Sequence, residues 1–217
     1  MKKYKVIAFD YDLTIADTSG IIAERINYTL KKFGYNELPF MTIAPYIGNL
    51  GSIILRELSG EKDPEKLEEM FKFYRGEVRQ ILPDNSGFFE GVTEGVKKLT
   101  EAGYRLGVVS LKPHKQITDP MRRYNIRQYF DIVIGSDDVP YFKPDPTGIF
   151  KTLEFFGVEK SEYLYVGDSL TDQQTAENAG VDFGAMLKGF TTKEQFEVKG
   201  ADYYFENFDM LCKELIK

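Results

Sequence analysis

The 217-residue sequence contains no tryptophan, one cysteine and one histidine. A single cysteine, Cys212, excludes an internal disulfide and is typical of a reducing compartment. It lies in an apolar helical pattern near the C-terminus, so we expect it in the core and not as a nucleophile. His114 follows Pro113 and is expected at the surface, where a helix begins. Chemistry based on cysteine or histidine is therefore not indicated.

The sequence also lacks any apolar run long enough to span a membrane. Its charged start leads into a short strand pattern interrupted by acids, which is not the pattern of a signal peptide. The net charge is 28 − 34 = −6, which disfavours a nucleic-acid backbone as partner. We therefore expect a cytoplasmic protein whose partner is neither a membrane nor a nucleic acid.

An apolar run from Tyr4 to Phe9 predicts a strand buried on both faces, as in a parallel sheet covered by helices. Two acids follow it, Asp10 and Asp12, and side chains two apart on an extended chain point the same way. Open α/β sheets bind ligands at this end of their strands. Adjacent carboxylates repel each other, so the pair indicates a bound cation or a shared proton, although solvated turn residues would give the same pattern.

Two kinds of pattern divide the chain. From residue 16 to residue 84 it is helical throughout, whereas strands and helices alternate further on. Such alternation predicts an α/β fold with a doubly wound, mostly parallel sheet. We predict a core of residues 1–15 and 85–217 with an all-helical cap inserted at 16–84. The later strands are expected at residues 105–109, 131–134, 163–166, 181–186 and 202–205.

The predicted cap carries its own signals. Asp63 with Pro64 predicts the start of a helix that continues to Ile81, and Ser52 is expected to cap another helix. Between helices, Gly48 and Asn49 belong to a loop that we expect to contact substrate, although loops of this composition are mostly turns.

Polar residues follow the other predicted strands. If the strands are parallel, these residues converge on the edge that holds Asp10 and Asp12. Carboxylate oxygens without histidine or cysteine favour Mg²⁺ over Zn²⁺. Such a cation, with a lysine, a hydroxyl and a carboxylate that attacks in line, suits phosphoryl transfer. The residues are Ser110, Lys143, Asp168 and Asp172.

Each of these residues also has a simpler interpretation. Ser110 could cap the next helix, and Lys143 could be a solvated surface charge. Asp168 and Asp172 could be turn and cap residues of one loop. The set is more specific than its members, because every strand end would have to be polar by coincidence.

Four segments resemble the four motifs of the haloacid dehalogenase superfamily, in their order along the chain. The helical insertion after the first is similar to that of the phosphoglycolate phosphatase-like members, which also include β-phosphoglucomutases and pyrophosphatases. The resemblance covers the whole chain. The segments are Asp10-Tyr11-Asp12-Leu13-Thr14, Val108-Val109-Ser110, Lys143-Pro144 and Gly167-Asp168-Ser169-Leu170-Thr171-Asp172.

The resemblance implies a Mg²⁺-dependent phosphatase that acts on a small phosphomonoester such as phosphoglycolate or a sugar phosphate. Asp10 would be the nucleophile and form an aspartyl phosphate. Asp12 would be the general acid and then the general base, and we hypothesise that cap closure helps to protonate it. By the same resemblance, Mg²⁺ would be bound by Asp10, by the backbone carbonyl of Asp12 and by Asp168, with Asp172 supporting these ligands. Ser110 would donate a hydrogen bond to the phosphoryl oxygens and Lys143 would neutralise their charge. Thr14 would orient the loop of the first motif.

Two positions depart from the family pattern. Leu13 stands where the phosphatases usually have glycine, and Leu111 stands where asparagine is frequent. The second change removes a polar substrate contact, which weakens the case for phosphoglycolate itself. Asp12 in turn argues against the dehalogenase branch, which lacks a second acid.

Several alternatives remain. A phosphomutase or a pyrophosphatase would use the same core. A mutase also needs a second phosphate site, for which the cap supplies cations such as Arg25. On amphipathic helices, however, such cations usually belong to the solvated face. A phospho-accepting receiver domain or a non-catalytic binding module is a different class. A receiver carries its acidic pair and its acceptor on different strands, which the spacing of Asp10 and Asp12 disfavours. Neither the substrate nor the oligomeric state follows from the sequence.

Overall fold

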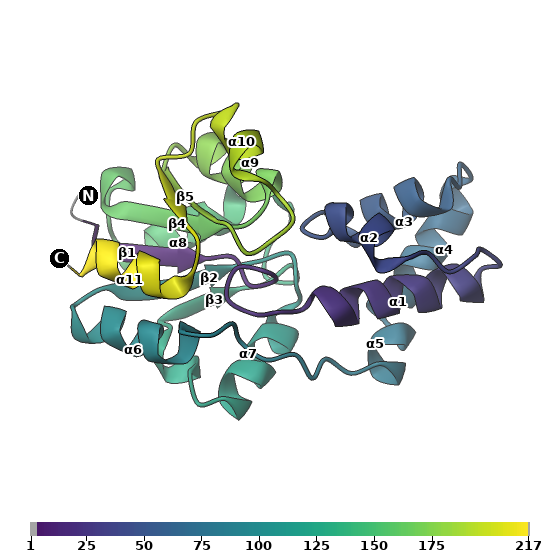
Figure 1. The fold of residues 1–217 in the computed structure, drawn as a ribbon, viewed down its shortest axis with the longest axis horizontal. Coiled ribbons are helices and arrows are strands. Elements are labelled where there is room, and N and C mark those ends of the chain that lie inside the picture. Colours follow the sequence, from purple (N-terminus) through teal and green to yellow (C-terminus); the bar gives the residue numbers. More distant parts are fainter. Residues whose placement is uncertain (1–3, 217) are drawn as a thin grey trace. The chain divides into compact units, whose positions relative to one another are not determined.

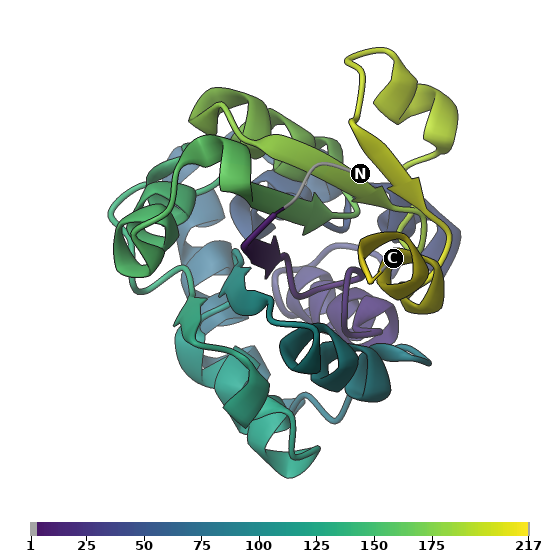
Figure 2. The same cartoon turned by 90° about the vertical axis from the view of Figure 1, so that its left-hand side faces the viewer.

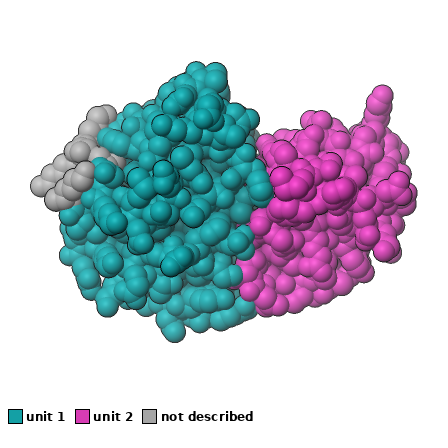
Figure 3. Space-filling view, in the orientation of Figure 1, with its two compact units in different colours: residues 1–17, 87–217 teal, residues 18–86 magenta. Residues whose placement is uncertain are grey.

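The computed structural model describes residues 4–216, so residues 1–3 and 217 of the predicted core lie outside it. The chain divides into two compact units (Figure 3). Unit 1 comprises Met1–Asp17 and Gly87–Lys217, and unit 2 is Thr18–Ser86. That unit 2 acts as a cap stays a prediction.

Unit 1 is built on one six-stranded sheet in the order β3-β2-β1-β4-β5-β6 (Figures 1 and 2). Every neighbouring pair is parallel, which confirms the predicted doubly wound sheet. The order also disagrees with a receiver domain, whose five strands follow the order 2-1-3-4-5. The strands are β1 (Val6–Phe9), β2 (Arg105–Val109), β3 (Ile132–Ile134), β4 (Tyr163–Gly167), β5 (Asp182–Met186) and β6 (Tyr203–Phe205).

Both faces of the sheet are covered by helices, as Figure 2 shows. In β1, Ile7 and Phe9 pack into the apolar cluster under α6, α7 and α11, while Val6 and Ala8 pack under α8, α9 and α10. Burial on two faces explains why the strand is apolar at every position. The helices are α6 (Val92–Glu101), α7 (His114–Arg123), α8 (Thr147–Phe156), α9 (Leu170–Ala179), α10 (Lys193–Glu197) and α11 (Phe208–Leu215), with short 3-10 turns η2 (Arg127–Tyr129) and η3 (Lys160–Glu162).

The direction of the winding reverses at β1. The chain places β2 and β3 on one side of β1 and then crosses to β4 on the other side. The backbone amide of Asp10 donates to the carbonyl oxygen of Val166 at 2.8 Å, so the ends of β1 and β4 are joined directly. Open α/β sheets bind ligands at such a reversal point.

The chain leaves unit 1 and returns to it at neighbouring residues. Ala16 pairs with Phe88 in an antiparallel bridge, and the amide of Asp17 donates to the carbonyl of Gly87 at 3.1 Å. This is the geometry expected of an inserted segment.

Unit 2 is helical throughout, and two details differ from the expectations. The helix predicted from Asp63 to Ile81 ends at Arg75 and resumes at Glu77, because Gly76 leaves the helical conformation (φ −101°, ψ −91°). Glycine in a helix interior costs about 1 kcal/mol, so a break there is inexpensive. Ser52 lies inside a helix whose N-cap is Leu50, with no side-chain cap. The elements are α1 (Ser19–Lys32), α2 (Phe40–Ile43), η1 (Ala44–Tyr46), α3 (Gly51–Ser59), α4 (Pro64–Arg75) and α5 (Glu77–Ile81).

Asp63 does cap α4, where its side chain accepts from the amide of Glu65 at 3.0 Å. Within residues 4–216, none of the helices combines the length and the apolar character that crossing a bilayer requires.

Candidate active site

An ion-paired lysine joins the ends of two strands. Asp10 follows β1, and its Oδ1 lies 2.8 Å from Nζ of Lys143. The same Nζ lies 2.6 Å from Oδ1 of Asp172, in the first turn of α9. The side chains of Lys143, Asp10 and Asp172 are all at most 6% exposed. The interpretation of Lys143 as a solvated surface charge is therefore wrong.

Asp168 adds a third buried carboxylate. It follows β4, is 1% exposed, and accepts a hydrogen bond from the hydroxyl of Thr14 at 2.9 Å. Oxygen atoms of Asp10, Asp168 and Asp172 lie within 4.8 Å of one another. Asp172 is also fixed by Ser169, whose hydroxyl and amide both donate to its Oδ2.

Burial acts against the charge of this cluster. It raises the pKa of Asp10 to about 7, although the ammonium of Lys143 acts in the opposite direction. Burial also raises the pKa of Asp168 well above its ordinary value, and the charges of Asp172 and Asp10 add to the effect. For Lys143 burial lowers the pKa, but the carboxylates of Asp10 and Asp172 outweigh it, so the pKa lies above that of a free lysine.

The three carboxylates fit a divalent cation. When all three carboxylates are ionised, one ammonium offsets one of their charges and two negative charges remain in a place that water hardly reaches. A cation among them would offset both the burial and the mutual repulsion that raise the pKa values of Asp10 and Asp168. All the candidate donors are oxygens, the ligands of hard cations. The family resemblance implied that Asp172 only supports the metal ligands, whereas in the structure its carboxylate is one of the three in the cluster.

Two glycines allow the carboxylates to approach so closely. A Cβ atom on Gly167 would lie 2.4 Å from Cβ of Asp172. A Cβ atom on Gly189, in the loop after β5, would lie 2.1 Å from Oδ2 of Asp168. The φ angle of Gly189 is not left-handed, so a side chain there is excluded by contact with Asp168 and not by backbone strain.

We expect Gly189→Ala to weaken divalent-cation binding by about ten- to a hundredfold, because it displaces a candidate ligand. The measurement is a Mg²⁺ titration followed both by phosphatase activity and by the rise in melting temperature. Gly20→Ala is the matched control, since a Cβ on Gly20 has nothing within 4 Å and its φ is ordinary. Equal Mg²⁺ dependence in the two variants would contradict the prediction.

Ser110 lies at the end of β2, beside the lysine. Its amide donates to the carbonyl of Ile134 at 3.0 Å, which places it between the ends of β2 and β3. Ser110, Leu111 and Lys143 line one small cavity of unit 1. The two residues thus border a common space, and their roles toward a phosphoryl group stay predictions. The hydroxyl accepts weakly from the amide of Lys112 at 3.3 Å.

Asp12 is oriented by a different cation. Its Oδ1 lies 2.7 Å from Nζ of Lys112, and the side chain is 18% exposed, against 4% for Lys112. The Asp12 carboxylate is not among the clustered oxygens, which belong to Asp10, Asp168 and Asp172. The predicted contribution of Asp12 through its backbone carbonyl stays a prediction. Between Asp12 and Thr14, Leu13 has φ 59°, the left-handed region that glycine favours, and its side chain is buried.

The residues predicted in the cap lie in unit 2. Gly48 is in the turn after η1 with φ 102°, and Asn49 donates from its side chain to the carbonyl of Tyr46 at 2.9 Å. Their contact with substrate stays a prediction. Arg25 is neither solvated nor a free anion site: it is 3% exposed, and Nε and Nη2 both donate to the carbonyl of Leu82, just after α5.

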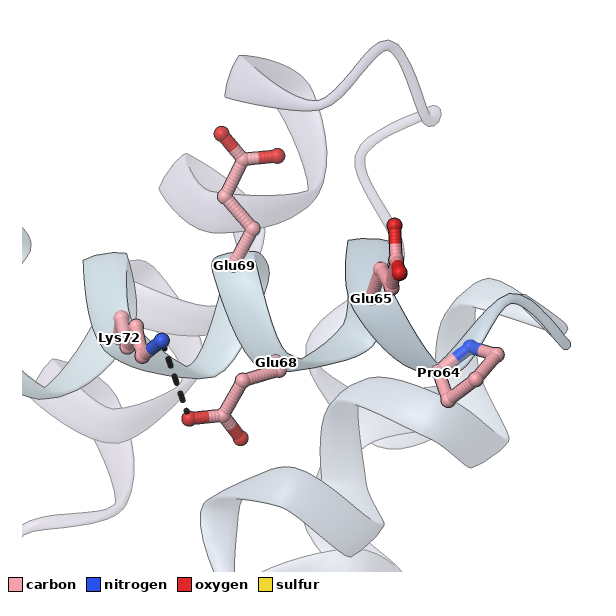
Figure 4. A pocket seen from close by; sticks show the side chains of 5 residues that line it. All are labelled: Pro64, Glu65, Glu68, Glu69 and Lys72. Carbon is pink, nitrogen blue, oxygen red and sulfur yellow. Dashed lines mark ion pairs between the residues drawn. The ribbon is translucent and has the colours of Figure 1, made fainter.

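A hollow of about 380 Å³ lies on α4 of unit 2 (Figure 4). It is lined by Pro64, three glutamates and Lys72. Glu68 pairs with Lys72 at 3.6 Å along the helix, and the other glutamates point to its other side in Figure 4. This is the solvated face of an amphipathic helix, and it holds none of the buried polar groups seen in unit 1.

Two residues of the site were missed by the sequence analysis. Tyr165, on β4, is buried, and its hydroxyl contacts Nζ of Lys143 at 3.2 Å, Oδ1 of Asp172 at 3.1 Å and the carbonyl of Val109 at 2.8 Å. Within an apolar strand, a tyrosine gives no signal of such a position. Lys112 could have been noticed, because it stands two residues after Ser110 just as Asp12 stands two after Asp10.

A doubly wound parallel sheet with a lysine and buried carboxylates at its point of reversal is typical of an enzyme that acts on an anionic group with a divalent cation. Residues 7–186 match the model of the haloacid dehalogenase-like hydrolases. The chain belongs to this family.

Similar proteins match along nearly the whole chain. A phosphoglycolate phosphatase of Nitrosospira multiformis is 34% identical over 97% of this chain and 92% of its own length. A pyrophosphatase PpaX of Bacillus mycoides is 28% identical over 96% and 95%. The crystal structure of a haloacid dehalogenase-like hydrolase from Bacteroides fragilis has 31% identity and a TM-score of 0.91, covering 96% of this chain and all of that one. The chain is thus a hydrolase of the phosphatase type.

Proposed function

We propose that the protein is a Mg²⁺-dependent phosphatase that hydrolyses a small phosphomonoester through an aspartyl phosphate on Asp10. The observation that carries the proposal is the buried group around Lys143, whose ammonium contacts both Asp10 and Asp172 beside Asp168. Asp10, Asp168 and Asp172 would hold the cation. When bound, Mg²⁺ supplies positive charge against the phosphoryl oxygens and removes repulsion among the carboxylates.

The first half-reaction uses residues at three strand ends. A carboxylate oxygen of Asp10 bonds to phosphorus as the bond to the leaving oxygen breaks, and Asp12 gives its proton to that oxygen. Lys143 and the hydroxyl of Ser110 stabilise charge on the phosphoryl oxygens. In the second half-reaction a water oxygen bonds to phosphorus, the bond to Asp10 breaks, and Asp12 takes the proton.

Phosphatase relatives over the whole chain support a small phosphorylated metabolite as substrate. Phosphoglycolate and pyrophosphate are the two candidates that these relatives suggest, and Leu111 in the cavity beside Ser110 favours a less polar contact than asparagine would give. We further propose that unit 2 is a cap that closes during turnover and that the protein works in the cytoplasm, as its lone buried cysteine supports.

Release of phosphate from p-nitrophenyl phosphate, with and without Mg²⁺, tests the activity. A panel of phosphoglycolate, glucose 1-phosphate and pyrophosphate then ranks substrates, and dependence on a bisphosphate primer would identify a mutase. Acid-quenched enzyme should carry phosphate that hydroxylamine removes, the behaviour of an acyl phosphate. Mg²⁺-independent turnover, or none on any phosphate, would contradict the proposal.

We expect Asp12→Asn to slow the hydrolysis of alkyl phosphates by about 10²–10⁴-fold, because an alkoxide is a poor leaving group unless it receives a proton. Pre-steady-state release of p-nitrophenol should change much less, since this phenol leaves as an anion. An equal loss on both substrates would mean that Asp12 does not act mainly as the acid.

A further inference from the structure

Lys112 is a buried cation to which the proposed mechanism gives no role. Its side chain is 4% exposed, although it lies on the loop between β2 and α7. Burying an ammonium is costly unless it is paired. Its Nζ lies 2.7 Å from Oδ1 of Asp12 and 5.4 Å from the centre of the Tyr11 ring. A partner of this ammonium is thus the proposed acid and base.

The backbone of Lys112 is held at the same time. Its carbonyl accepts from the amide of Ser136 at 3.0 Å, and its amide donates to the hydroxyl of Ser110 at 3.3 Å. Gly135 permits this approach, because a Cβ there would lie 2.8 Å from the Lys112 carbonyl oxygen. Lys112 therefore extends from a fixed base on the β2 and β3 loops to Asp12 on the β1 loop.

We propose that Lys112 is a positioning residue that holds the Asp12 carboxylate at the angle needed for proton transfer in both half-reactions. This inference rests on the proposed function. The side chain of Asp12 is 18% exposed and could otherwise adopt several rotamers, whereas an ammonium fixed by its own backbone and by the Tyr11 ring restricts it. Such restraint matters because acid–base catalysis needs the proton within hydrogen-bond reach of the reacting oxygen.

The test compares Lys112→Met, which keeps the length of the side chain, with Lys112→Arg, which keeps the charge. Lys115→Met is the matched control, since Lys115 is exposed three residues further on. For an alkyl phosphate, we expect kcat to fall by about 10- to 100-fold in Lys112→Met, with KM little changed, and to recover in part in Lys112→Arg. The rise in melting temperature caused by Mg²⁺ should stay as in the wild type.

Pre-steady-state kinetics with p-nitrophenyl phosphate give a second readout. The rate of the p-nitrophenol burst should stay within about threefold of the wild type, because this step needs no acid. The burst amplitude should grow, since hydrolysis of the aspartyl phosphate, in which Asp12 is the base, becomes slower. A residue with only a structural role would lower both rates together.

A double-mutant cycle tests whether Lys112 acts through Asp12. If Lys112 acts through Asp12, Lys112→Met should have almost no effect in an Asp12→Asn background. Additive losses, equal losses on both substrates, or a raised KM at unchanged kcat would overturn the proposal, and the last would indicate contact with substrate. Failure of the proposed function would look different, because the wild type would then release no p-nitrophenol in a Mg²⁺-dependent way.

Discussion

Asp10→Asn is expected to abolish turnover and yet to stabilise the folded protein when no divalent cation is present. Loss of the nucleophile should reduce kcat by a factor of about 10⁴ or more. The gain in stability arises because the variant removes one of three buried carboxylates that share a single ammonium. Few substitutions in an active site should separate activity and stability so clearly.

The direction of this stability change and the pH range in which it occurs follow from the raised pKa of Asp10. The pKa of Asp10 is about 7 in the folded protein, against an ordinary value of 3.8, so the folded state binds the proton more tightly. Stability due to this group is complete below about pH 4 and is lost as the pH rises to about 7. The difference, 7 − 3.8, is about 3 units, or up to about 4 kcal/mol at pH 8.

Chemical denaturation of wild type and variant in EDTA, between pH 4 and pH 8, measures the effect. The two free energies of unfolding should agree at the acid end and separate as the pH rises, with Asp10→Asn the more stable. Mg²⁺ should then raise the melting temperature of the wild type more than that of the variant. Glu90→Gln, which changes an exposed acid, is the control. A wild type that stays the more stable form at pH 8 in EDTA would refute the argument.

Lys143→Met should have the opposite effect on stability. It leaves three buried carboxylates without their ammonium, and removal of one partner from a buried ion pair costs about 3–5 kcal/mol. Activity should fall by about 10²–10³-fold, the usual result of removing one group that stabilises transition-state charge. The instability should lessen at low pH, where the carboxylates take up protons, and on addition of Mg²⁺.

A combination of both changes tests whether one charge cluster explains both results. In Asp10→Asn/Lys143→Met, the loss of stability should be smaller than the sum of the two single effects, because Asp10→Asn then removes a buried carboxylate that has lost its ammonium. Thermal unfolding in EDTA at pH 8 measures it, with Lys115→Met as the control for loss of a lysine charge. Strictly additive free energies would show that the two side chains do not interact in the way their 2.8 Å separation implies.

The sheet could be predicted almost to the residue, because its strands are buried on both faces and read as continuous apolar runs. The strand expected at 163–166 is observed at Tyr163–Gly167, for example. The break in the helix at Gly76 could not be predicted, since the apolar stripe of the helix continues through it. The meeting of Asp10 with Lys143 followed from strand ends alone, given that all strands are parallel.

Contacts made by long side chains between distant parts of the sequence could not be predicted from the sequence. The pairing of Lys112 with Asp12 joins residues 100 positions apart, and the contact of Tyr165 with the Val109 carbonyl spans 56. Both require the order β2-β1-β4, which a strand pattern does not give. Asp172 was expected at the same edge, but only in support of the metal ligands, because the spacing of residues does not tell which carboxylate oxygens come together.

The left-handed backbone of Leu13 has a consequence for recognising such enzymes. A leucine in this region costs about 1–2 kcal/mol relative to glycine, and burial of its side chain offsets that cost. What the loop requires at this position is thus a torsion angle, which more than one amino acid can supply. Genome searches that insist on glycine after the second aspartate would pass over chains like this one.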